Sequence, residues 1–371
     1  MTQTPQRILV ILFPVLGDVL LGTPLIRALR RRYPDARIDV LVNVGCSIVL
    51  RGNPDIDEVI EVERRPGLRS YFALARRILR RYDLAVTMAL SDRASIYAWA
   101  AARRVVTWVN PGKRYYGLIR RMYSEWPETA RGPTHPLQAN ASVAELLSLP
   151  YDGRVVAPRE PGAGERVAEL LSDTHGPVAI LHPGCRLAYK QWHDQGWQTV
   201  ARELQKRGYA LVVTGGDDAE ELAYIESLFG ELEQVTVAAG RLRFGDIGEL
   251  MTRAALFIGV DTSITHLAAA AGMPTVVLFG PEDPSIWAPW PAQQGRFSAP
   301  VYPARGDCGA ENVAVVHSGL PCVPCRRSGC DDHPFSRSEC IDEIQPERLF
   351  RALERIMRGE PAAAAPGGNA R

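Results

Sequence analysis

The chain has 371 residues, of which 46% are hydrophobic and 23% are charged, and its formal net charge is +1. These values are typical of a soluble globular protein of about two domains. No apolar run approaches the roughly 20 residues that span a bilayer, which excludes a membrane-spanning chain. The apolar stretch after Arg7 resembles the core of an export signal, but Asp18 follows it at once and no small-x-small cleavage site is present. We therefore expect a cytoplasmic protein.

The charge is distributed unevenly along the chain. Residues 1–150 contain 22 Lys and Arg against 13 Asp and Glu, a balance of +9, and subtraction from the totals of 43 and 42 leaves 21 against 29, or −8, for the rest. Solvated helix faces explain many of the basic clusters. The alternative is attraction of the basic half to an anionic polymer or membrane surface.

Apolar, β-branched runs alternate with amphipathic helical stretches in the first half, which predicts a parallel sheet covered by helices. Thr23-Pro24 suits a helix start. Two alternatives stay open: one helix that begins near Asp18 and bends at Pro24, or a short turn before a newly capped helix. The expected strands are 7–13, 36–42, 58–62, 84–90 and 105–109, and the expected helices include 24–33 and 70–82.

A second series of the same kind follows a Gly- and Pro-rich passage, 131–161, that surrounds one expected helix, 140–149. Its strands are expected at 178–184, 209–216, 235–240, 255–261 and 275–281, and its helices at 197–208, 220–228, 247–254, 264–272 and 346–359. The simplest architecture is α/β, with two Rossmann-like halves facing a cleft. We predict domains over 1–155 and 156–345, a C-terminal helix over 346–358 and a disordered low-complexity tail over 359–371.

Four segments lie where strands lead into helices: GDVLLGTP, HPGCRLAYKQW, TGGDDAEE and GVDTSITH. Ligands of open α/β sheets bind at such carboxyl ends of strands. None of the four contains GxGxxG or the P-loop pattern, so their joint occurrence is what indicates a site.

The segment GVDTSITH predicts a diphosphate cradle. Asp261, Thr262 and Ser263 open a helix whose free amides and hydroxyls suit a diphosphate, and His266 lies about one turn inside it. The plainer interpretations are a helix N-cap and a packed histidine.

Two further segments offer groups for a nucleotide. Lys190 lies in the loop after the first strand of the second half, where a lysine can contact phosphate. Gly215 and Gly216 allow close backbone approach, and Glu220 is our choice among the nearby acids for ribose hydroxyls.

Together these motifs, in this order, resemble glycosyltransferase family 9, which includes the ADP-heptose:lipopolysaccharide heptosyltransferases. The segments 17–36, 182–192 and 259–290 carry the resemblance. It implies a GT-B fold with the acceptor on the N-terminal domain and the nucleotide sugar on the C-terminal domain. It also implies inverting transfer of a heptose from ADP-heptose to a hydroxyl of the lipopolysaccharide inner core, at the cytoplasmic face of the inner membrane.

The resemblance also assigns roles to residues. It implies that Asp18 is the general base, that Lys190 contacts the donor phosphate, and that Asp261, Thr262 and His266 form the donor motif. Ser263 stands where the family commonly has Gly, and Cys185 and Arg186 stand where it has small hydroxyl residues. On the acceptor side we place Gly17, Arg64 and Arg65.

The chemistry agrees with these roles. An inverting transfer needs a base for the acceptor proton and positive groups for the departing diphosphate. It requires no cofactor, and we interpret the one DxD match, Asp55-Ile-Asp57, as a polar turn. Helix capping is the alternative role for Asp18.

Five of the seven cysteines lie between Cys308 and Cys340, whereas Cys46 and Cys185 are isolated. A CxxC pair in a reducing compartment indicates a structural zinc or iron. The autotransporter branch of the family, which has a cysteine-bound iron finger, supports that hypothesis. Reduced thiols and disulfides are the alternatives. The candidate metal ligands are Cys322, Cys325, Cys330 and Cys340, with Cys308 as a substitute.

The expected partners are ADP-heptose or a related nucleotide sugar, an anionic lipopolysaccharide core and the inner-membrane surface, on which the protein would be peripheral; no nucleic acid is expected. Alternatives within the family are a protein (autotransporter) acceptor or another nucleotide-sugar donor. A nucleotide-sugar epimerase would need further acid/base residues that we cannot identify. A non-catalytic homologue that binds nucleotide sugar or lipid A is disfavoured by the intact Asp18, Lys190 and Asp261.

Overall fold

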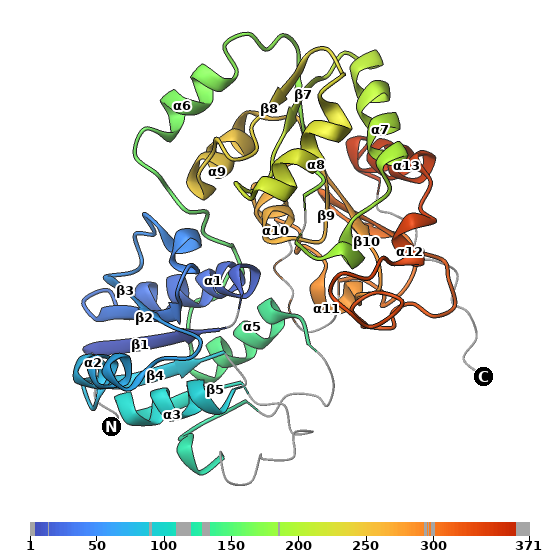
Figure 1. Ribbon diagram of the computed structural model, residues 1–371. Helices are drawn as coiled ribbons and strands as arrows, with labels where there is room; N and C mark the ends of the chain where they lie inside the picture. The colour runs from blue at the N-terminus through green and yellow to red at the C-terminus, as the bar shows by residue number, and fades with distance from the viewer. Residues whose placement is uncertain are drawn as a thin grey trace. The chain divides into compact units, whose positions relative to one another are not determined.

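The computed structural model describes residues 4–13, 15–88, 91–108, 120–127, 134–184, 186–292, 295, 297 and 301–360. The chain divides into two compact units (Figure 1). Unit 1 comprises residues 1–158 with 295–299, and unit 2 comprises residues 159–294 with 300–371. Each unit is an α/β layer structure built on its own sheet.

The sheet of unit 1 has five parallel strands in the order β3-β2-β1-β4-β5. β1, the middle strand, is buried on both faces, as its apolar run predicts. The strands are β1 (Arg7–Leu12), β2 (Arg37–Asn43), β3 (Glu58–Val62), β4 (Tyr82–Thr87) and β5 (Ala102–Thr107).

Helices cover both faces of this sheet. α1 packs on β1, β2 and α5, whereas α3 packs on β1, β4 and β5 and contacts α2. The helical segments are α1 (Leu16–Arg32), η1 (Ser47–Leu50), α2 (Leu68–Ile78), α3 (Asp92–Ala101), η2 (Arg120–Met122) and α5 (Pro136–Leu146).

α1 runs through Pro24 without interruption, so the first alternative, a single helix that begins near Asp18, is confirmed. Pro24 has no N–H to offer the Leu20 carbonyl. The buried hydroxyl of Thr23 donates to that carbonyl at 2.7 Å and accepts from the Val156 N–H at 2.9 Å. This hydroxyl therefore replaces the bond that proline removes.

The Asp55-Ile-Asp57 match makes structural contacts. Asp57 accepts from the Ile38 N–H at 2.7 Å and forms an ion pair with Arg30 at 2.5 Å. Asp55 forms an ion pair with Arg27 at 3.5 Å. Both carboxylates thus link the turn before β3 to its neighbours.

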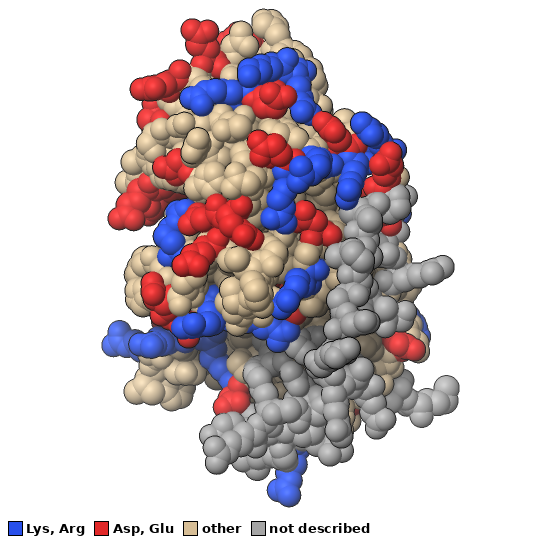
Figure 2. All heavy atoms as spheres, turned by 90° about the vertical axis from the view of Figure 1, so that its right-hand side faces the viewer, with Lys and Arg blue, Asp and Glu red and all other residues tan. Residues whose placement is uncertain are grey.

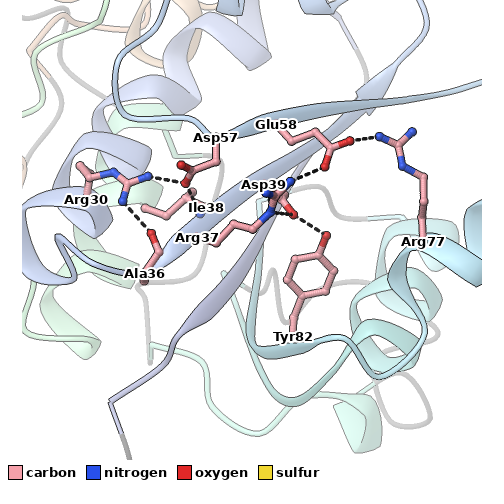
Figure 3. A network of polar contacts seen from close by, with 9 residues as sticks. All are labelled: Arg30, Ala36, Arg37, Ile38, Asp39, Asp57, Glu58, Arg77 and Tyr82. Carbon is pink, nitrogen blue, oxygen red and sulfur yellow. Dashed lines mark hydrogen bonds and ion pairs between the residues drawn. The ribbon is translucent and has the colours of Figure 1, made fainter.

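A polar network closes the amino edge of this sheet, where its strands begin (Figure 3). Buried Asp39 accepts from the Tyr82 hydroxyl at 2.8 Å and pairs with Arg37 at 3.0 Å. Glu58 pairs with Arg37 at 2.5 Å and also with Arg77 of α2. These contacts fasten the C-terminal turn of α2, which contains Arg77, to the edge opposite the carboxyl ends of the strands.

The sheet of unit 2 has the strand order β11-β12-β10-β9-β6-β7-β8. Among the described strand pairs of this sheet, only β11–β12 is antiparallel. The strands are β6 (Val178–His182), β7 (Ala210–Val213), β8 (Val235–Val237), β9 (Leu256–Val260), β10 (Thr275–Phe279), β11 (Cys308–Ala310) and β12 (Val313–His317).

One face of this sheet packs against α7, α8 and α13 in a core that includes Trp192 and Trp197. α10 contacts β9, β10 and α9, and α6 contacts α9. The helical segments are α6 (Ala163–Leu170), η3 (Ala188–Lys190), α7 (Asp194–Lys206), α8 (Ala219–Phe229), α9 (Phe244–Arg253), α10 (Ser263–Ala270), α11 (Pro284–Trp287), α12 (Glu339–Asp342) and α13 (Pro346–Met357).

The expected strands and helices all occur, with ends shifted by a few residues. One helical difference concerns α2, which we expected to reach residue 82. It ends at Ile78 because Arg80 has a left-handed backbone (φ +52°) and β4 begins at Tyr82. Elements that we did not expect include α3, α6, β11 and β12.

Parts of the predictions lie outside the described residues: the end of the expected strand 84–90, residue 109 of the next strand, and most of the tail. Among the residues that the structure describes, none of the helices has the length and apolar character needed to cross a membrane.

Candidate active site

The order of strands in unit 1 reverses between β1 and β4. In an open α/β sheet, the carboxyl ends of the strands at such a switch point form the usual ligand site. Asp18 follows β1 at this point, and Arg93 follows β4 as the second residue of α3.

Asp18 is the third residue of α1, and the N-cap is Val15. Burial raises the pKa of its carboxyl group to about 6, although a hydrogen bond with the Val15 backbone lowers it in part. The carboxyl group therefore contributes to the helix start, and its pKa also lies in the range that suits a general base near neutral pH. Capping and base roles are compatible here.

Arg93 organises the same edge, although no sequence motif singles it out. Its Nη1 donates to the carbonyls of Glu63 at 2.9 Å and Arg64 at 2.7 Å, and its Nη2 donates to Asn43 Oδ1 at 2.6 Å. The guanidinium lies 4.6 Å from the centroid of the Phe13 ring. One side chain thus joins the ends of β1 and β2 to the loop after β3.

The three acceptor-side residues lie at this edge too. Gly17 is the second residue of α1, next to Asp18, and Arg64 and Arg65 follow β3 with exposed side chains. Cys46 lies close by. Burial raises the pKa of its thiol, Arg64 lowers that pKa, and Asp18 raises it. The structure therefore gathers two exposed cations and the candidate base around one edge.

In unit 2 the strand order reverses between β6 and β9. Lys190 lies in η3 after β6, and Asp261 directly follows β9. Lys190 Nζ is 2.5 Å from Asp261 Oδ2 and 3.5 Å from the Asp261 carbonyl oxygen. Only 18% and 10% of the two side chains are exposed, so this charge-assisted contact is shielded from water.

α10 begins beside that ion pair. Its N-cap is Thr262, whose side chain makes no capping hydrogen bond, and Ser263 is its first residue. The first amides of a helix have no partner within the helix, so they suit an anion. The predicted position of Thr262 and Ser263 at a helix start is confirmed.

His266 is buried on α10, one turn further on. Burial lowers the pKa of its imidazole to about 4; Asp261 raises it and Lys190 lowers it further. Its Nδ1 is buried and has no hydrogen-bond partner among the described residues. A neutral imidazole with a spare nitrogen can hydrogen-bond to a ligand.

Gly215 and Gly216 follow β7, two strands from β9. Glu221 Oε1 accepts from the Gly216 N–H at 3.0 Å. A Cβ added at Gly184 would lie 1.8 Å from that same oxygen, so a side chain there would displace the Glu221 carboxylate. Glu221 thus faces the glycines, whereas the Glu220 we chose is exposed at the start of α8.

Glu282, after β10, is a further ionisable group that we did not select from the sequence. Burial raises the pKa of its carboxyl group, Lys190 lowers it and Asp261 raises it. Its neighbour Asp283 caps α11 and pairs with Arg326 at 2.6 Å. The signal available in the sequence was an acidic pair that follows a buried strand after a Gly-Pro turn.

The cysteine-rich segment supports the loop that carries Lys190. The Ala188 N–H donates to the Pro334 carbonyl at 3.1 Å, and the Arg326 N–H donates to the Pro281 carbonyl at 2.9 Å. These backbone bonds join the segment to the loops after β6 and β10.

The four candidate metal ligands lie near one another. The pKa of the Cys340 thiol is raised to about 12. Burial is the largest cause, and the charges of the neighbouring Cys325, Cys322 and Cys330 add to it. No group of three or more His, Cys, Asp or Glu side chains in the described part of the chain is arranged to hold a metal ion, and Cys308, in β11, belongs to no such group either. The arrangement of thiols therefore gives no support to the predicted zinc or iron site. Cys185 lies outside the described residues.

Comparison with known families decides the classification. The model of "Glycosyltransferase family 9 (heptosyltransferase)" matches residues 71–314. The chain belongs to glycosyltransferase family 9. It is 30% identical over 302 residues to lipopolysaccharide heptosyltransferase 3 of Escherichia coli, a match that covers 77% of this chain and 87% of the relative.

Solved structures of family members have the same fold. A glycosyl transferase family 9 protein from Veillonella parvula has a TM-score of 0.71 and 21% identity, covering 95% of this chain and 97% of its own. The E. coli ADP-heptose lipopolysaccharide heptosyltransferase II has a TM-score of 0.68 and 19% identity, covering 95% and 98%. The predicted family, the GT-B fold class and the prediction of a glycosyltransferase are confirmed.

Proposed function

We propose that this family 9 glycosyltransferase moves a heptose from ADP-heptose to a hydroxyl of the lipopolysaccharide inner core, with inversion at the transferred carbon. The names of its relatives support the donor and the acceptor: one is a lipopolysaccharide heptosyltransferase 3, and another is an ADP-heptose lipopolysaccharide heptosyltransferase II.

The observation that carries the proposal is the Lys190–Asp261 pair at the switch point of unit 2. Without a ligand, Lys190 neutralises Asp261. When a diphosphate binds, the ammonium can contact its oxygens while the amides of α10 face the same charge. Asp261 then becomes available to accept a hydrogen bond from a sugar hydroxyl.

His266 and Glu221 complete the donor site in this proposal. The neutral imidazole of His266 donates a hydrogen bond to the diphosphate, and burial favours this neutral form because it lowers the pKa to about 4. Glu221, beside Gly215 and Gly216, is better placed for ribose hydroxyls than Glu220 because its carboxylate already lies at the glycines.

Asp18 acts as the general base. Its carboxylate removes the proton of the acceptor hydroxyl as that oxygen bonds to the anomeric carbon, and the bond to the diphosphate oxygen breaks on the opposite side. The ADP leaves with the electron pair of that bond. Such a base contributes about 10²–10⁴-fold. Every step uses side chains of this chain, so the proposed transfer needs no cofactor.

The acceptor is proposed to bind at the carboxyl edge of unit 1. Arg64 and Arg65 are exposed there, and they suit the carboxylates and phosphates of an inner-core acceptor. Arg93 holds the backbone of this loop. The protein would work in the cytoplasm, at the inner face of the inner membrane.

The test is a turnover assay with a panel of nucleotide sugars and a set of truncated core acceptors. The proposal expects release of ADP only when ADP-heptose and an inner-core acceptor are both present. Turnover of another nucleotide sugar, or of a protein acceptor, would reject this substrate assignment while leaving the family intact.

A further inference from the structure

Unit 1 carries an exposed apolar stripe on α2. Leu68, Phe72 and Ala75 stand at positions i, i+4 and i+7, which lie on one side of a helix, and Leu79 continues the spacing as the C-cap residue. Leu68 is 79% exposed, Phe72 is 70% exposed and Leu79 is 57% exposed.

A neighbouring side of α2, about 100° around the helix from the stripe, makes the contacts that hold the helix in place. Leu74 and Ile78 are buried in the core that packs on the sheet of unit 1. The exposed stripe is therefore a second apolar face, one that the packing of unit 1 does not use. Contiguous exposed apolar side chains of this kind mark interaction surfaces.

Basic side chains border the stripe. Residues 67–82 include five arginines and no acidic residue. Arg77 is engaged with Glu58 in the network of Figure 3, and Arg80 lies 5.3 Å from the centroid of the Trp99 ring. Arg69 and Arg76 are exposed on α2, and at about 100° per residue they fall next to the stripe.

We call Leu68, Phe72, Leu79, Arg69 and Arg76 the α2 surface. It differs from the face that Figure 2 draws, on which acidic and basic side chains are interspersed among the described residues. The α2 surface instead combines large apolar side chains with positive charge, and its segment contains no acid.

We propose that the α2 surface docks on a lipid bilayer that exposes anionic headgroups. A short helix with apolar and basic side chains on one exposed side can lie in the plane of the interface, with the apolar groups among the acyl chains and the arginines at the headgroups. Two copies of the α2 surface packed together would bring their arginines into mutual repulsion, which disfavours a second copy of this chain as the occupant.

The position of α2 gives the docking a use, and this step rests on the proposed function. α2 begins just after the loop of Arg64 and Arg65, whose backbone Arg93 holds at the carboxyl edge. Docking through α2 would thus present the edge with the candidate base to acceptors anchored in the same membrane.

The first experiment is flotation of the full chain with vesicles of phosphatidylcholine alone and of phosphatidylcholine and phosphatidylglycerol in equal amounts. We expect binding to the anionic vesicles that weakens as salt is added, and much weaker binding to the neutral ones. Failure of the wild-type protein to float with the anionic vesicles would overturn the proposal.

Two double variants test the surface itself. Arg69→Gln/Arg76→Gln should weaken binding to the anionic vesicles about 30-fold. Leu68→Ser/Phe72→Ser should weaken it at least about tenfold. Because these side chains are exposed, both variants should keep the wild-type melting temperature.

Matched controls lie on unit 2. Arg202→Gln/Arg351→Gln removes two exposed arginines, and Phe335→Ser removes an apolar side chain that is 77% exposed. Both should bind vesicles like the wild type. Wild-type vesicle binding by the α2 variants would reject the α2 surface. If those variants changed only the sedimentation of the protein without vesicles, the occupant would be a second copy.

The outcome for docking can be separated from the outcome for the proposed function. Flotation requires no turnover, so a protein that floats but transfers no heptose would reject only the proposed function. The α2 variants should keep the wild-type rate on a soluble core fragment and lose rate only on an acceptor embedded in anionic vesicles.

Discussion

The two switch points of this protein each carry an aspartate, but the surroundings of the two carboxyl groups differ. In unit 2, Asp261 follows β9 and is neutralised by Lys190 at 2.5 Å. In unit 1, Asp18 follows β1, and burial raises the pKa of its carboxyl group to about 6. An acid paired with a cation holds that cation beside a ligand site, whereas a buried acid with a raised pKa is suited to take up a proton.

The difference follows from what surrounds each acid. The arginine at the switch point of unit 1, Arg93, is committed to backbone carbonyls and to Asn43. The lysine at the switch point of unit 2 reaches its carboxylate directly. The two sheet edges are alike in topology, but their aspartates differ because the nearby cation contacts the carboxylate in unit 2 and contacts other groups in unit 1.

The largest expected effect comes from removing the unit 1 acid. Asp18→Asn keeps the size of the side chain and removes the base, so kcat should fall by about 10²–10⁴-fold. Binding of ADP-heptose, measured by calorimetry, should stay within about twofold of the wild type, roughly the scatter of such measurements. Asp35→Asn, an exposed acid after α1, is the control and should change neither quantity. Parallel loss of turnover and donor binding would contradict the base assignment.

Removing the cation of unit 2 should produce the converse result. A charge-assisted contact to phosphate contributes about 1.5–3 kcal/mol, so Lys190→Met should weaken donor binding by about 10–150-fold. Calorimetry with ADP measures this effect directly. Lys206→Met, an exposed lysine at the end of α7, should bind ADP like the wild type. Unchanged ADP affinity in the Lys190 variant would show that the diphosphate does not bind at Lys190.

The pH dependence sharpens the same contrast. A base with a pKa of about 6 is protonated below that pH and cannot accept a proton, so kcat/KM should fall about tenfold per pH unit below pH 6 and level off above it. The measurement is a profile of kcat/KM at saturating donor. Melting temperatures measured over the same pH range show whether the fall of kcat/KM below pH 6 comes from unfolding instead of from protonation of the base. A profile without a limb near pH 6 would argue against Asp18 as the titrating group.

The sequence predicted both edges because strand-to-helix junctions are local patterns: Asp18, Lys190 and Asp261 each directly follow an apolar run or lie in the loop after it. It could not predict the Lys190–Asp261 pair itself, which depends on β6 and β9 being neighbours although 71 residues separate the two side chains. No local periodicity encodes such a long-range pairing.

Residues whose role depends on direction were missed for a related reason. The run DDAEE offers four acids, and only the phase of α8 turns Glu221 toward the glycines and leaves Glu220 in solvent. Arg93 resembles any surface arginine until its partners, at the end of β2 and in the loop after β3, are in place. The strand β12 did have a local signal, the buried run Val313–His317, which the nearby cysteine-rich pattern obscured.

The smallest expected effect concerns His266, whose low pKa separates it from both acids. A neutral imidazole that donates one hydrogen bond to the diphosphate contributes about 0.5–1.5 kcal/mol, so His266→Gln should weaken ADP binding by about 2–12-fold. The control is His175→Gln, an exposed histidine before β6. Because the pKa of His266 is about 4, wild-type ADP affinity should show no histidine titration between about pH 5.5 and 8. Tighter binding toward about pH 5.5 that His266→Gln abolishes would mean that the imidazole binds the diphosphate as a cation, which would place a second positive charge beside Lys190 and make this edge still more unlike that of Asp18.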